Sequence, residues 1–274
     1  MDAYICVTCG VQQAPSGGPP PRCPICEDER QYVRQSGQAW TTLTELKASG
    51  HRIELRDVEP RLLGVGVEPA FGIGQRALLV QTADGNLLWD CVGYIDDASV
   101  ESIRSRGGIG GIAMSHPHFY GVMVEWSQAF DDAPIYIPEA DKEWVRRPNP
   151  AIRPWSGAIQ VLPGLTLVQC GGHFDGSAVL HWNDGAEGKG ALLVGDTLTV
   201  VPDIRYVSFM RSYPNLIPLP ASDVRKVVDA VRPYAFDRVY GGWWDRVMPT
   251  GGLEAVERSA RRYLRWIGSE QEPY

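Results

Sequence analysis

The order of hydrophobic and polar positions predicts a mixed α/β chain from about residue 52 onward. Residues 77–92 contain two apolar runs, ALLVQT and LLWDCV, separated by an Asp84-Gly85 pair, which is the usual signature of a tight hairpin. Short β-rich runs bounded by glycines follow, namely GGIGGIAMS, GLTLVQC, SAVLHW and GALLVGD. These patterns predict many short strands with turns between them.

Helices are predicted among and after these strands. WTTLTELKASG places Leu43 and Leu46 on one side and ends at Gly50, and DDASVESIRSRGG ends in two glycines. Two further amphipathic helices follow from apolar residues at helical spacing, the first with Val224, Val227, Val228 and Val231, the second with Leu253, Val256, Ala260, Tyr263 and Ile267. Strand pairs interleaved with helices predict helices on both outer faces of a sheet sandwich.

Composition and charge argue against nucleic acid and membranes as partners of this protein. The chain has 274 residues and a net charge of −7, and this acidic balance argues against a nucleic-acid surface. It has no run of about 18 apolar residues that would span a membrane, and MDAYICVTCG lacks the basic and apolar parts of a secretion signal. We therefore expect a cytoplasmic protein without a nucleic-acid or membrane partner; the sequence leaves its oligomeric state open.

Four of the six cysteines lie in the first 26 residues, which is the pattern of a metal site. Cys6 and Cys9, then Cys23 and Cys26, form two C-x2-C pairs with 13 residues between them. Four thiolates at this spacing are typical of a structural zinc site. The pattern resembles zinc ribbons and also rubredoxin, whose four cysteines hold iron, so either metal remains possible. Because the cysteine cluster is far in sequence from the histidines described next, we expect its metal to be independent of any activity at those histidines.

A second group of candidate ligands stands where predicted strands end. Of five histidines, His116 and His118 lie in SHPH and His173 lies in CGGHFDGS, while Asp196 follows a strand in LLVGDT. Short loops at strand ends can converge, so these side chains are candidates for one site.

This set resembles the metallo-β-lactamase superfamily, over about residues 52–274. The first two histidines of the family's H-x-H-x-D-H motif match His116 and His118, its later histidine in a G-G-H turn matches His173, and its metal-bridging aspartate matches Asp196. The resemblance implies an α+β fold, the αββα sandwich. A zinc-ribbon-like or rubredoxin-like module at residues 1–38 and a linker helix at 39–51 would precede it.

The second metal position of the family is altered in this sequence. Tyr120 stands in place of an aspartate ligand, Gly121 in place of a histidine, and Gly-Trp-Trp at 242–244 in place of the last histidine. Glycine has no side chain and tryptophan offers only an N–H donor. The resemblance therefore implies a single metal ion held by His116, His118 and His173 with Asp196 as the fourth ligand. Zinc suits this donor set, and iron or manganese also fits it.

Several aromatic residues are candidates for contact with a substrate. Tyr120 either assists catalysis as an acid or oxyanion donor, or fills the altered second-metal position. Trp243 and Trp244 either line the pocket at the predicted histidine site or belong to the hydrophobic core. Residues 209–220 read as a long loop whose Phe209 and Tyr213 either line an apolar pocket or simply cover the fold.

Together these features predict a mononuclear metal-dependent hydrolase of a small-molecule ester, amide or thioester. The metal would activate water, Asp196 would complete or orient the site, and Tyr120 would assist. Two alternatives remain, an iron-dependent oxygenase of the same fold and a non-catalytic binding protein with a relic metal site.

Overall fold

The computed structural model describes residues 1–269, and the chain divides into two compact units. Unit 1 consists of residues 1–137 and 141–155, and unit 2 of residues 138–140 together with the chain from 156 onward. Within the described residues, no helix has the length and apolar character that crossing a membrane requires.

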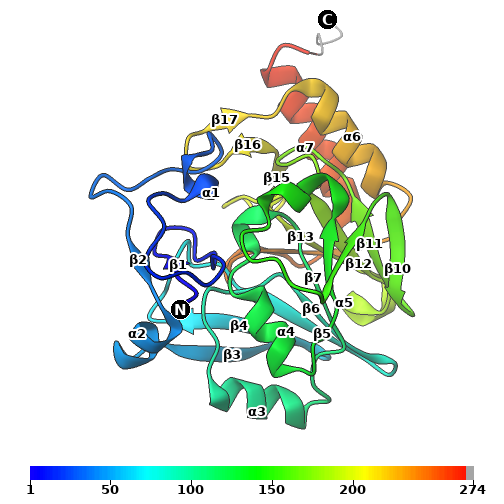
Figure 1. Ribbon diagram of the computed structural model, residues 1–274. Helices are drawn as coiled ribbons and strands as arrows, with labels where there is room; N and C mark the ends of the chain where they lie inside the picture. Colours follow the sequence, from blue (N-terminus) through cyan, green and yellow to red (C-terminus); the bar gives the residue numbers. More distant parts are fainter. Residues whose placement is uncertain (270–274) are drawn as a thin grey trace, which may run out of the picture. The chain divides into compact units, whose positions relative to one another are not determined.

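Unit 1 is built on a seven-stranded sheet whose strands follow one another in chain order (Figure 1). The strands are β3 (Arg52–Glu59), β4 (Leu62–Glu68), β5 (Ala77–Thr82), β6 (Gly85–Trp89), β7 (Gly111–Ala113), β8 (Ile135–Pro138) and β9 (Ile152–Trp155). Neighbours from β3 to β6 are antiparallel, whereas β7 joins β6, and β8 joins β7, in parallel. The predicted hairpin is confirmed, because Thr82 pairs with Gly85 across the turn.

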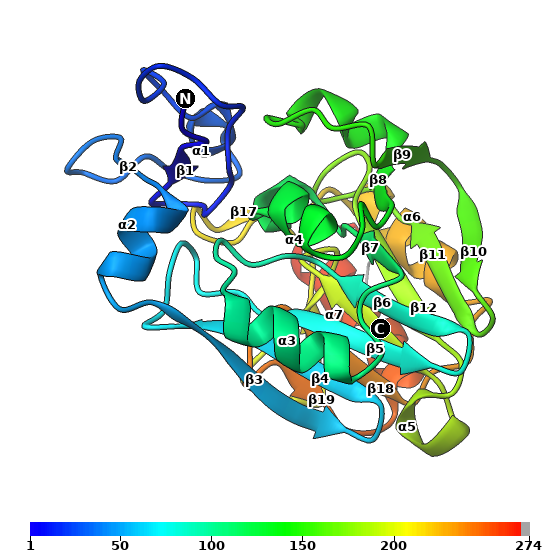
Figure 2. The same cartoon turned by 60° about the horizontal axis from the view of Figure 1, so that its bottom comes forward.

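Short helices connect these strands and cover the sheet. They are α2 (Leu43–Ala48), α3 (Asp97–Ser105), α4 (Met123–Ala129) and the 3-10 helices η1 (Pro117–Phe119) and η2 (Glu139–Trp144). Both predicted helices of this region, α2 and α3, are confirmed. A reciprocal cap between Thr42 and Glu45 starts α2, and Asp96 caps α3. Figure 2 shows α3 lying across the sheet, where it packs on β3.

The N-terminal segment of unit 1 has little regular structure. It contains β1 (Ile5–Cys6), which pairs with β2 (Trp40–Thr41), and one turn of helix, α1 (Pro24–Glu27). Its buried residues, Ile5, Val11 and Ile25 among them, belong to the same hydrophobic cluster as the sheet residues Leu79 and Ile112. The segment thus shares a core with the sheet, and the domain boundaries expected at residues 38 and 51 stay predictions.

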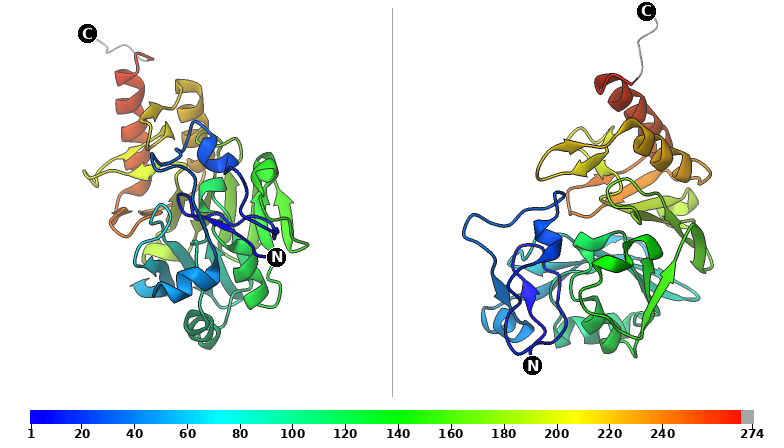
Figure 3. Two further views of the ribbon diagram at one scale, coloured as in Figure 1. Left: turned by 60° about the vertical axis from the view of Figure 1, so that its left-hand side comes forward. Right: turned by 45° about the horizontal axis from the view of Figure 1, so that its top comes forward.

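Unit 2 contains a six-stranded sheet in the order β10-β11-β12-β13-β18-β19. Its strands are β10 (Ala158–Leu162), β11 (Leu165–Gln169), β12 (Ala178–Trp182), β13 (Ala191–Gly195), β18 (Arg238–Gly241) and β19 (Val247–Met248). The long helices α6 (Ala221–Val231) and α7 (Gly252–Trp266) lie side by side in both views of Figure 3. Both helices, and the strands predicted at residues 165–169, 178–182 and 191–195, are confirmed.

One prediction for unit 2 is wrong in detail. Residues 209–220 do not form a plain loop, because β16 (Met210–Ser212) pairs with β17 (Ile217–Pro218) in a short hairpin. Its turn ends at Leu216, which adopts a left-handed φ of +55° and whose N–H bonds to the Tyr213 carbonyl. Periodicity gives no signal for strands of two or three residues. The small elements β14 (Thr199–Val200), β15 (Val207–Ser208) and α5 (Gly185–Gly188) complete the unit.

Candidate functional site

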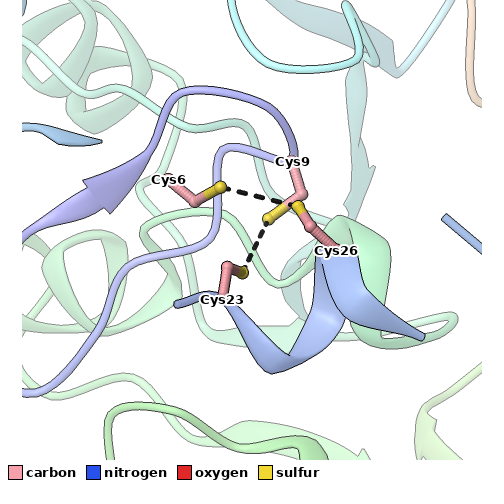
Figure 4. Close-up of side chains that lie close together, drawn as sticks. All are labelled: Cys6, Cys9, Cys23 and Cys26. Carbon is pink, nitrogen blue, oxygen red and sulfur yellow. Dashed lines mark hydrogen bonds between the residues drawn. The ribbon is translucent and has the colours of Figure 1, made fainter. Parts of the chain in front are cut away.

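The four N-terminal cysteines converge on one point, as Figure 4 shows. Cys6 ends β1 and Cys9 lies on the turn that follows, where the Gly10 N–H bonds to the Cys6 carbonyl. Cys23 is the N-cap residue of α1 and Cys26 lies within this helix. Their Sγ atoms lie 3.5 Å apart for Cys6 and Cys26 and 3.8 Å apart for Cys9 and Cys23. All four thiols are buried and none forms a disulfide.

This geometry fits a tetrahedral metal ion. Four thiolates at the usual zinc–sulfur distance of about 2.3 Å stand roughly 3.8 Å from one another. The Gln38 side-chain amide donates to the Cys6 sulfur at 3.2 Å, which is the kind of outer hydrogen bond that orients a thiolate ligand. The cluster therefore suits a structural ion, and its identity as zinc or iron stays a prediction.

His116 and His118 are held rigidly just beyond the end of β7. His116 is extended, with φ −171° and ψ 168°, and Pro117 then starts the η1 turn that carries His118. The two imidazole centroids lie 5.1 Å apart and both rings are buried. The Ser115 hydroxyl lies 2.8 Å from His116 Nδ1, so this contact fixes the ring through Nδ1 and makes Nε2 the candidate ligand atom.

Asp90 is a positioning residue that the sequence did not reveal. It follows β6 in a left-handed conformation, φ +64°, and its buried carboxylate accepts a hydrogen bond from the Ser115 N–H at 2.7 Å. The Asp90 N–H bonds in turn to the Ala113 carbonyl. Asp90 thus ties the end of β6 to the residues that carry the histidines, and a lone Asp in an apolar run gave no signal for this role.

His173 and Asp196 both belong to unit 2. His173 Nδ1 lies 3.1 Å from the Met210 carbonyl, which can only accept, so Nδ1 is the protonated nitrogen and Nε2 carries the lone pair. Asp196 follows Gly195 at the end of β13, and the next residue, Thr197, donates from its hydroxyl to the Ala178 carbonyl. The carbonyl of Met210 is backbone, so no sequence pattern points to it.

The four predicted ligands come together. His116, His118, His173 and Asp196 each offer one ligand atom, and these atoms lie within 4.8 Å of one another. All four residues are buried, with exposed fractions of 0, 2, 1 and 4%. Three imidazoles and one carboxylate are a donor set that zinc and several first-row metals accept. The residues therefore fit a metal ion, although their roles as ligands stay predictions.

Two residues at the position where the resemblance would place the second metal, Tyr120 and Gly121, have structural surroundings of their own. The Tyr120 hydroxyl donates to the Asp141 backbone carbonyl at 3.3 Å, and burial raises the pKa of this phenol well above its usual value. Gly121 has φ +48°, and a Cβ there would lie 2.3 Å from the Val92 carbonyl oxygen. No side chain fits at position 121 with this backbone. A catalytic role for Tyr120 stays a prediction.

The predicted substrate residues fall in different surroundings. Tyr213 and Trp243 line one groove of about 360 Å³, together with Val200, Val201 and Arg246. Trp244 is half-buried. Phe209 is fully buried and packs edge-on against Tyr263 in the core of unit 2, so the structure gives it a packing role. Contact of any of these residues with a substrate stays a prediction.

Tyr213 links this groove to two candidate ligands. Its ring lies 5.7 Å from that of His173, and its hydroxyl lies 3.3 Å from the carbonyl oxygens of both Asp196 and Ser208. Burial, followed by the nearby Asp196 carboxylate, raises the pKa of Tyr213 well above its usual value. The phenol therefore stays protonated at neutral pH and donates to these carbonyls.

The remaining histidines lie outside the cluster. His181 donates from Nε2 to the Ala235 carbonyl at 2.7 Å, and burial lowers its pKa, so it is a neutral core residue. His51 contacts the Ser49 hydroxyl and the ring of Phe71.

Comparisons with known proteins give one sequence relative and many structural ones. No model of a protein family matches the chain. It is 50% identical over 272 residues, or 98% of both chains, to the uncharacterized protein YmaE of Bacillus subtilis strain 168. Three similar crystal structures are those of VMB-1, of the metallo-β-lactamase DIM-1 and of a B3 metallo-β-lactamase with an active-site glutamic acid.

These structures match at low sequence identity but over most of their length. VMB-1 has a TM-score of 0.58 at 14% identity and DIM-1 a TM-score of 0.58 at 12%, and each alignment covers 79% of this chain and 98% of the other. The B3 enzyme has a TM-score of 0.54 at 15% identity, with 85% of this chain and 97% of the other covered.

Proposed function

Because this chain belongs to the family of Bacillus subtilis YmaE and has the metallo-β-lactamase fold, we propose that it is a metal-dependent hydrolase of a small molecule. The α+β fold expected from the sequence, with its small four-cysteine module, is confirmed. The observation that supports the proposed activity is the buried cluster of three imidazoles and one carboxylate. The solved structures with a similar fold include the metallo-β-lactamase DIM-1 and a B3 metallo-β-lactamase.

The chain's own residues would hold and orient the ion. His116 and His173 each have Nδ1 engaged, by Ser115 and by the Met210 carbonyl respectively, so that Nε2 is the ligand atom. His118 and Asp196 would complete the set. A divalent ion held there would lower the pKa of a water molecule toward neutrality and polarise a carbonyl group. We propose zinc for this site, and iron and manganese fit the same donors.

The groove beside Tyr213 is the part of unit 2 suited to an apolar portion of the substrate. Val200, Val201 and the Trp243 ring give it apolar walls, and Arg246 adds a cation whose side chain is 32% exposed. We propose an ester, thioester or amide whose apolar part packs on Trp243. Arg246 Nε lies 3.7 Å from the carboxylate of Asp245, which lines the same groove, so we propose no charge requirement for the substrate.

Turnover by purified full-length protein tests this function. The protein loaded with one metal at a time is assayed against aryl esters, thioesters, amides and lactams, each with and without a carboxylate. We expect hydrolysis by the zinc form and a loss of at least about 10³-fold in kcat/KM for His173→Ala, because one of three imidazoles is removed. His51→Ala is the control and should keep full activity, since His51 lies outside the cluster.

Two results would contradict the proposed hydrolysis. Equal turnover by His173→Ala and the unmodified protein would contradict a role for the histidine cluster in hydrolysis. If only the iron form is active, and only in the presence of dioxygen, the protein is an oxygenase rather than a hydrolase, because zinc has no redox chemistry.

A further inference from the structure

The four-cysteine segment touches the loop that follows β6. Gly10 comes directly after Cys9, and a Cβ on Gly10 would lie 3.6 Å from the Cα of Gly93 and 3.9 Å from that of Gly72. Conversely, a Cβ on Gly93 would lie 3.1 Å from the Gly10 Cα, and one on Gly72 would lie 3.3 Å from the Cys9 carbonyl carbon. Three glycines therefore allow the backbone of the cysteine turn to pack directly on residues 72 and 93.

The same loop, residues 90–93, is also hydrogen-bonded to the segment that carries His116 and His118. The Ser115 N–H donates to the Asp90 carboxylate at 2.7 Å. The Cys91 N–H donates to the Phe119 carbonyl, and the Val122 N–H to the Val92 carbonyl, each at 3.1 Å. Residues 90–93 thus contact both the cysteine turn and the segment that carries the histidines.

Gln12 makes a second and more direct link. Its backbone N–H donates to the Gly121 carbonyl at 3.0 Å, three residues after His118. Its side-chain amide donates to the Glu125 carboxylate at 3.1 Å, and its amide oxygen accepts from the Arg147 guanidinium. Gln12 is only 4% exposed, and Glu125 lies in the first turn of α4. The residue just beyond the cysteine turn therefore holds both ends of the segment from Gly121 to α4.

We propose that the metal-loaded cysteine cluster positions the His116–His118 segment, with Gln12 as the positioning residue that transmits the effect. This inference rests on the proposed function, since it takes the histidine cluster to bind a metal ion. Loss of the ion at the cysteines frees the turn at Cys6–Gly10, which loosens the contacts of Gly10 and Gln12 and lowers the affinity of the histidine cluster. Coupled binding is reciprocal, so occupancy of the histidine cluster also strengthens binding at the cysteines. The cysteines and the histidines are far apart in sequence, which suggested two independent metals. These contacts connect the two clusters in the folded chain.

The test uses two readouts that do not depend on turnover. The Zn²⁺ affinity of the histidine cluster is measured on the full chain by competition with a chromogenic chelator, and His116→Ala identifies the binding step that belongs to this cluster. Hydrogen exchange is followed for peptides covering residues 113–123, which contain the bonded amides of Ser115 and Val122.

Gln12→Ala is the main variant because it leaves all four cysteines in place. We expect it to weaken Zn²⁺ binding at the histidine cluster by about 5- to 150-fold, the usual range for coupled sites, and to speed exchange in residues 113–123. Gln13→Ala is the matched control. Gln13 is also buried, at 8% exposure, yet its side-chain nitrogen has no hydrogen-bond partner among the described residues. It should change neither readout.

Cys9→Ser removes the ion at its source and should reproduce both effects of Gln12→Ala. Unchanged exchange and unchanged zinc affinity in both Gln12→Ala and a folded Cys9→Ser protein would overturn the coupling. Failure of the proposed function would give a different result, namely no metal binding at the histidine cluster of the unmodified protein. If the histidine cluster of the unmodified protein binds no metal, exchange in residues 113–123 still decides whether the cysteine ion orders this segment.

Discussion

At the scale of single residues, Gly121, at the position where the family resemblance would place a second-metal histidine, has a backbone that admits no side chain. Its φ of +48° and the 2.3 Å approach of a Cβ to the Val92 carbonyl oxygen leave no room for a side chain. Gly121→Ala should therefore lower the free energy of unfolding by about 1–2 kcal/mol for left-handed strain and by about 1–3 kcal/mol more for overpacking. Gly74→Ala separates the two costs, because Gly74 has φ +72° but nothing within 4 Å of its Cβ position, so it should show the strain alone. Urea unfolding measures both, and equal losses in the two variants would contradict the steric argument.

At the scale of elements, Asp96 joins a helix to a strand. One carboxylate oxygen accepts from the Ser99 N–H at 2.8 Å and caps α3, and the other accepts from the Ile53 N–H at 2.7 Å at the start of β3. Asp96→Ala should cost about 2 kcal/mol or more, since it removes a cap and leaves a second backbone donor without its charged acceptor. Asp97→Ala is the neighbouring control: its side chain is 99% exposed and pairs with an exposed Lys47, so its loss should cost less than about 0.5 kcal/mol. Denaturant midpoints compare the variants, and a neutral Asp96→Ala would show that neither bond stabilises the fold.

At the scale of the whole molecule, the chain carries two separate ligand sets, and we expect one metal ion at each. Elemental analysis of the full-length protein should give two ions per chain. Cys9→Ser should lose the ion at the cysteines, and His116→Ala should lose the other while the protein stays folded. Anomalous scattering from crystals soaked in excess zinc should show a single ion at the histidine cluster, because Gly121 cannot present a ligand. A second full-occupancy peak about 3.5–4 Å from the first, the spacing of two-metal hydrolases, would contradict this expectation.

The sequence by itself determined the features whose physical cause is local. The hairpin at Asp84-Gly85, the helix that starts with Thr42 and Glu45, and the paired cysteines all depend on residues within a few positions of one another. The candidate ligands His116, His118, His173 and Asp196 were also found from sequence, because each follows an apolar or glycine-rich run and their order resembles the motifs of the metallo-β-lactamase superfamily. The alternation of apolar and polar residues did not predict the strands β14 to β17, since strands of two or three residues are too short to show a period.

Only the tertiary structure decided which distant residues support these features. Asp90 reaches Ser115 across 25 positions, His173 bonds to the backbone of Met210, and Gln12 reaches Gly121 across more than a hundred. Each of these contacts involves a backbone group or an isolated polar residue, which leaves no periodic or spaced pattern in the sequence. The partner is chosen by how the sheet, the loops and the cysteine turn pack, because a buried polar group must find a hydrogen bond wherever packing places it. The same packing turns Gly10, Gly72 and Gly93 from apparent loop residues into the contact between the cysteine turn and the strand end that supports the histidines.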